Sequence, residues 1–78
     1  MNIYLISQTV NDEYDTYDSA VVCAESEESA QTIHPYSKQS PSDDYGDWCD
    51  PADVTVKYLG IAAPHLPKGV ICSSFNAG

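Results

Sequence analysis

The sequence predicts an α+β domain of two layers, in which one short helix packs on a mostly antiparallel sheet of about four strands. Two observations lead to this expectation. Four apolar or alternating runs have the length of strands, and one segment between the second and third runs has the signals of a capped helix. The expected order is β-β-α-β-β, and a chain of 78 residues forms a single domain, 1–78.

The first strand is expected over residues 3–9. Ile3 and Leu5 fall on one face of this strand, and Tyr4 and Ile6 fall on the other. Because both faces are apolar, the strand should lie centrally in the sheet, with at least one face covered.

The other three strands are expected over residues 19–25, 54–60 and 70–75. The first of these is a continuous apolar run with two adjacent valines, which is typical of a buried strand. The next one alternates, which puts three side chains on one face: Val54, Val56 and Tyr58.

A short helix is expected over residues 26–35. Ser26 can cap it by accepting a hydrogen bond from an amide of the first turn, and the two glutamates that follow lie at the positive end of the helix dipole. Pro35 ends the helix, because the residue before a proline disfavours helical geometry. Ala30 and Ile33 give it a narrow apolar stripe for docking on the sheet.

Residues 35–53 form a long irregular acidic loop with three prolines and one glycine. Loops of this length in small domains are usually functional or mobile. A sheet covered by one helix leaves its other face and at least one edge open, and pairing of two copies would hide either. A homodimer is therefore one possible state.

Charge is the unusual feature of the composition. The chain has twelve acidic residues, all between Asp12 and Asp53, against three lysines and no arginine, and its net charge is −9. Such a chain repels nucleic acid and anionic membranes, and it attracts cations and basic protein surfaces. The alternative is that the charge only confers solubility. The N-terminal ten residues lack the basic segment of an export signal, so we expect a cytoplasmic protein.

The sequence contains no signal of a metal site or cofactor. Cys23, Cys49 and Cys72 are an odd number and are expected to be thiols; Cys23 and Cys72 lie in apolar strand runs, which favours core positions. Together with His34 and His65 they show no metal-ligand spacing. We therefore expect no metal and no cofactor.

Enzymatic activity is not expected either. The sequence has no G-x-S-x-G turn around a nucleophile and no basic environment that would lower the pKa of a thiol, and the acids near Cys49 should raise it. Phosphate-binding motifs are also missing. A sponge for a nucleotide signal would need the three scattered lysines, Lys38, Lys57 and Lys68, and it stays open as an alternative.

Aromatic residues lie among the carboxylates in two stretches, and this combination favours an interaction surface. Tyrosine and tryptophan are typical interface anchors, and carboxylates form forked pairs with arginine. For Trp48, the only tryptophan, a core position is equally compatible. The predicted partner-binding residues are Asp12, Glu13, Tyr14, Asp15, Tyr17, Asp18, Asp43, Asp44, Tyr45, Asp47 and Trp48.

The segments YDTYDSAVVCAESEESAQTIHP, VTVKYLGIA and GVICSSFNAG resemble a class of small acidic proteins encoded by bacteriophages and prophages, which includes anti-CRISPR and other anti-defence inhibitors. The resemblance covers most of the chain except residues 36–50 and carries no catalytic motif. It implies a non-enzymatic inhibitor in the host bacterial cytoplasm. Its target would be a protein whose basic surface holds nucleic acid, as in DNA mimicry. A small phage housekeeping protein is the remaining alternative.

Overall fold

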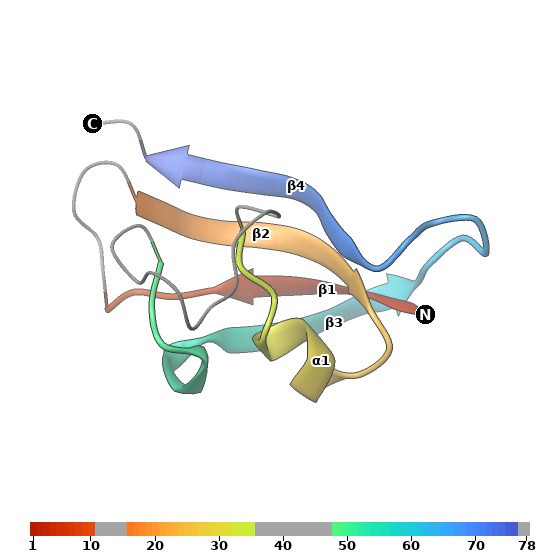
Figure 1. Cartoon of the computed structure of the whole chain (residues 1–78), viewed down its shortest axis with the longest axis horizontal. Helices are drawn as coiled ribbons and strands as arrows, with labels where there is room; N and C mark the ends of the chain where they lie inside the picture. Colours follow the sequence, from red (N-terminus) through yellow and green to blue (C-terminus); the bar gives the residue numbers. More distant parts are fainter. Residues whose placement is uncertain (11–15, 36–47, 77–78) are drawn as a thin grey trace.

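The computed structural model describes residues 1–10, 16–35 and 48–76, and for the last two of these, residues 75 and 76, the backbone only. The elements follow one another as β1 (Asn2–Ser7), β2 (Thr16–Ala24), α1 (Glu27–Gln31), the 3-10 helix η1 (Pro51–Asp53), β3 (Thr55–Ile61) and β4 (Gly69–Asn76). The architecture is α+β, with a four-stranded antiparallel sheet and one short helix (Figure 1). The predicted order did not include η1, which lies within the segment expected to be irregular.

The strands lie in the order β3-β1-β2-β4, so β1 and β2 are central and β3 and β4 are the edges. Every neighbouring pair is antiparallel. The central position of β1 was predicted from its two apolar faces, and the structure confirms it. Side chains of Tyr4 and Ile6 lie opposite Val22 and Ala20 on β2, and all four are buried.

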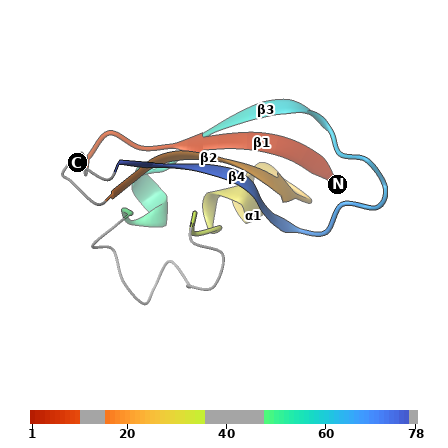
Figure 2. The same cartoon turned by 90° about the horizontal axis from the view of Figure 1, so that it is seen from above.

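One face of the sheet is covered by α1 and η1, and Figure 2 shows both on the same side of the strands. The core lies between these two layers. It is formed by Tyr4, Ile6, Ala20, Val22, Ala24, Ala30, Trp48, Cys49 and Val54. The expected common face of Val54, Val56 and Tyr58 is also confirmed, because Val56 pairs with Ile6, Tyr58 pairs with Tyr4, and Val54 belongs to the core.

The opposite side of the sheet, here called the open face, carries no helix or connection from the part of the chain that the structure describes (Figure 2). Strand pairing and alternation define this face. Apart from the buried Cys23, its centre on β1 and β2 is half-buried, while its margins on β3 and β4 are exposed. The side chains of the open face are Ile3, Leu5, Ser7, Ser19, Val21, Cys23, Thr55, Lys57, Cys72 and Ser74.

Helix α1 begins as predicted and ends earlier. The Oγ of Ser26 accepts a hydrogen bond from the Ser29 amide at 3.2 Å, which caps the first turn. The helix ends at Gln31 rather than continuing to the residues before Pro35. The hydroxyl of Thr32 donates to the Ser29 carbonyl at 2.8 Å, and such local bonds from β-branched residues favour helix ends over helix interiors.

Strand β2 begins at Thr16, three residues before the expected start. Thr16 and Tyr17 are good strand formers, and a register shift between Tyr17 and Ser19 leaves Asp18 as an extra residue in a bulge against β4. The bulge accommodates an aspartate, which strands otherwise disfavour. Tyr17 and Asp18 are therefore part of the sheet and not of the preceding acidic connection.

Candidate acidic binding surface

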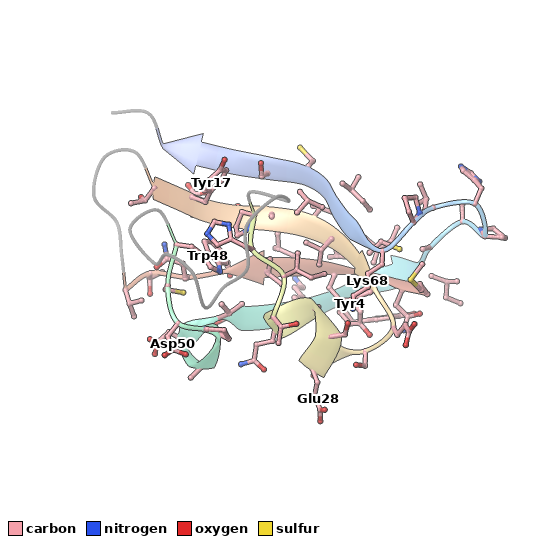
Figure 3. All side chains as sticks on the ribbon, in the orientation of Figure 1. Tyr4, Tyr17, Glu28, Trp48, Asp50 and Lys68 are labelled. Carbon is pink, nitrogen blue, oxygen red and sulfur yellow. The ribbon has the colours of Figure 1, made fainter. Side chains whose placement is uncertain are left out.

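Four exposed carboxylates lie on the helix side of the molecule and form what we call the acidic layer. Glu27 and Glu28 come from the first turn of α1, while Asp50 and Asp53 come from the cap and last residue of η1. Figure 3 shows Glu28 pointing outward from the lower end of α1 and Asp50 at the start of η1. None of these four carboxylates is among the partner-binding residues predicted from the sequence.

Capping interactions explain why these acids occupy fixed positions. The Oδ1 of Asp50 accepts from the Ala52 amide at 3.0 Å, and Pro51 occupies the first turn of η1, where its missing N–H is no loss. The Nε2 of Gln31 donates to the Pro51 carbonyl at 2.7 Å, which ties α1 to η1 across twenty residues of sequence. The acidic layer is thus held by two capped turns and one bond between them.

An open pocket of about 260 Å³ lies within the acidic layer, between α1 and the beginning of β3. Its apolar lining comes from Val54 and Val56, and its polar lining comes from Glu27, Glu28 and Gln31. A lysine or arginine side chain combines an apolar stem with a cationic end, so its stem fits the valines while its charge meets the glutamates. The site therefore suits a basic side chain from a partner protein.

The described charges are unevenly distributed. Six of the twelve acids lie in described residues, and all six are exposed: Asp18, Glu25, Glu27, Glu28, Asp50 and Asp53. The side chains that define the open face include no carboxylate and one lysine, Lys57. As far as the described side chains are concerned, two copies would therefore repel each other more strongly through their helix sides than through their open faces.

Three of the predicted partner-binding residues can be placed, and they do not form one surface. Trp48 is 1% exposed and belongs to the core, so its assignment as an interface anchor is wrong and the core alternative holds. Its ring lies 6.5 Å from that of His34, measured between centroids. Figure 3 shows Trp48 over the sheet. A thin core with one helix of five residues needs the largest side chain of the chain to fill it.

Tyr17 is half-buried and packs against the core, with its ring edge-on to that of His34 at a centroid distance of 6.3 Å. Its carbonyl accepts from the Gln8 side chain at 2.9 Å. Asp18 is exposed in the bulge, where its Oδ1 accepts from the Ser19 hydroxyl at 3.1 Å. The remaining predicted residues lie outside the described residues: Asp12, Glu13, Tyr14, Asp15, Asp43, Asp44, Tyr45 and Asp47.

The cysteines occupy three different environments. Cys23 is buried as expected, whereas Cys72 is exposed on the edge strand β4, so its expected core position is wrong. An apolar run in an edge strand does not need to be covered on both faces. Among residues 1–10, 16–35 and 48–76, no three histidine, cysteine or acidic side chains come together as metal ligands.

Cys49 is buried beside the acidic layer. Burial raises the pKa of its thiol to about 11, and the charges of Asp53 and Asp50 add to this effect. The direction predicted from the neighbouring acids is confirmed, although burial makes the larger contribution. The thiol is therefore protonated at neutral pH.

None of the helices in the described part of the chain is long and apolar enough to cross a membrane. No family model, curated protein or solved structure matches this chain significantly.

Proposed function

We propose that the protein is a non-enzymatic inhibitor that binds, through its acidic layer, a basic surface on a bacterial defence or nucleic-acid-handling complex. The observation that supports this proposal is the set of four exposed carboxylates on α1 and η1, two of which, Glu27 and Glu28, line a pocket, in a chain with a net charge of −9. The resemblance to small acidic phage proteins suggests the class of target.

The expected contact is an ion pair between partner lysines or arginines and the acidic layer. Neither Lys57 nor Lys68 forms an ion pair with a described carboxylate, so a partner does not have to displace either of them within the described part of the chain. Val54 and Val56 add apolar contact for the stem of a basic side chain. Exposed ion pairs are individually weak, and such a surface gains affinity from several of them acting together.

A pull-down from nuclease-treated bacterial lysate tests the proposal, with two variants of equal charge. Glu28→Gln with Asp53→Asn removes two charges from the acidic layer, while Ala63→Lys with His65→Lys adds two positive charges in the β3–β4 connection. Each pair changes the formal net charge from −9 to −7. We expect the first pair to weaken capture of the partner and the second to leave it nearly unchanged.

Salt and DNA give two further readouts. Capture should decrease steeply with ionic strength, because exposed charges are screened beyond roughly 10 Å at about 0.1 M salt. Duplex DNA added to the lysate should compete for the partner if its basic surface holds nucleic acid. Capture that is indifferent to salt, or equal losses for both charge variants, would refute binding through the acidic layer.

The same variants separate this proposal from a nucleotide sponge. A sponge needs cationic groups, and both charge variants leave Lys57 and Lys68 in place. Its capacity for a nucleotide would therefore survive the loss of Glu28 and Asp53 charges, whereas inhibition by binding a basic surface would not.

A further inference from the structure

We infer that the open face is the contact between two copies of this chain, which pair sheet to sheet with their acidic layers turned outward. This inference does not depend on the proposed function. Its basis is the open face itself: an apolar centre made by Ile3, Leu5 and Val21 that is only half-buried in one copy. Figure 2 shows the whole α1 and η1 layer on the other side.

The distribution of charge favours a second copy of the chain as the binding partner of this face. Two molecules of net charge −9 repel each other wherever their carboxylates meet. The side chains of the open face include no carboxylate, so the described strands of two copies can approach there without opposing acids. Lys57 lies on the edge strand β3 and is exposed, so it can keep its charge in water beside the contact. Asp18 borders the face at the far end of β2, and we place the contact around Leu5, Val21 and Cys72.

The side-chain chemistry of the face also suits self-pairing. Around the apolar centre lie small serine, threonine and cysteine side chains, which permit close approach of two sheets at about 10 Å. A twofold axis through the face brings the same patch together from both copies. The pairing would cover apolar surface that a one-helix domain cannot cover itself.

The face is small for a protein–protein contact. Four strands spaced about 4.8 Å apart, with six or so residues each at about 3.4 Å, give a flat face of roughly 400 Å². Standard interfaces bury roughly 800 Å² per partner. A contact of this size is typical of weak, reversible association, so the dimer should form only as the protein concentration rises.

Two neighbouring residues on β4 provide a matched test. Cys72 and Ser73 are both exposed on the edge strand, but Cys72 lies opposite Val21 on the open face and Ser73 lies opposite the buried Ala20 on the helix side. Cys72→Glu and Ser73→Glu therefore add the same charge to the same strand on opposite faces. Because both positions are exposed, neither change disturbs the core.

Sedimentation equilibrium over a range of protein concentrations measures the outcome. The wild type should pass from 8.5 kDa to twice that mass with increasing concentration. Cys72→Glu should weaken self-association about tenfold or more, while Ser73→Glu should stay within about twofold of the wild type. Added salt should strengthen the wild-type dimer, because it screens the repulsion between the two acidic layers.

Thiol labelling gives a second readout that needs no substitution. Cys72 is the exposed cysteine, while Cys23 and Cys49 are buried. One thiol should react quickly with a disulfide reagent in dilute protein and more slowly in concentrated protein, where the second copy covers it. A mass of 8.5 kDa at every concentration, or equal weakening by the two glutamates, would overturn the inference.

Discussion

Cys49 should make the stability of the protein decline at alkaline pH. Its pKa rises from 9.0 to about 11 on folding, chiefly through burial and further through Asp53 and Asp50. The folded protein holds this proton at pH values where the unfolded chain has lost it, so the stabilisation is complete below pH 9 and is lost as the pH rises through 11. The loss in free energy of unfolding is on the order of 1 kcal/mol at about pH 10 and approaches about 3 kcal/mol at higher pH.

Urea unfolding of the wild type and of Cys49→Ala, from neutral pH to about pH 11 under reducing conditions, measures this loss. Cys49→Ala should lower stability at neutral pH through lost packing, but its curve should be flatter in the alkaline range. All other side chains are the same in both proteins, so the difference between the curves isolates the Cys49 thiol. Parallel curves between pH 9 and 11 would refute the assignment of the alkaline loss to Cys49.

Three further substitutions test the packing and the capping bonds by denaturant unfolding followed by circular dichroism. Trp48→Ala should cost about 3–5 kcal/mol, because the ring is fully buried, and a cost below about 1 kcal/mol would mean that the ring is not part of the core. Ser26→Ala should cost about 1 kcal/mol through loss of the cap, whereas the exposed Ser74→Ala should be nearly neutral. Gln31→Ala should cost about 1 kcal/mol by releasing η1 from α1, and an unchanged stability would show that this bond contributes nothing.

Much of the fold was predictable because its signals are local. The two apolar faces of the first strand predicted its central position, and the serine at position 26 predicted the helix cap that Ser29 completes. The boundaries were less predictable, since they depend on contacts that the sequence does not show. The helix ends early where Thr32 bonds to its own turn, and β2 starts early because a bulge accommodates Asp18.

The acidic nature of the candidate surface was predictable from the sequence, but the residues that form it were not. The charge of the chain predicted an acidic surface, but which acids share a side depends on how α1 and η1 are tied together by Gln31 and Pro51. Aromatic character alone did not distinguish an anchor from a core residue, and Trp48 proved to be the latter. For Cys72 the error was the opposite one. Its apolar run predicted a core position, but the run forms the edge strand β4 and the thiol is exposed.

Because of the strand order, the first strand, β1, matters more for the integrity of the sheet than the last strand, β4. The first strand holds β2 on one side and β3 on the other, so a deletion that removed it would leave β3 with no neighbour in the sheet. Deletion of β4 would leave three adjacent strands joined. The pairing of β1 with β3 also closes a segment of about fifty residues, and such distant pairings are slow to form. The hairpin of β1 and β2 should therefore assemble first, with the edge strands joining it afterwards.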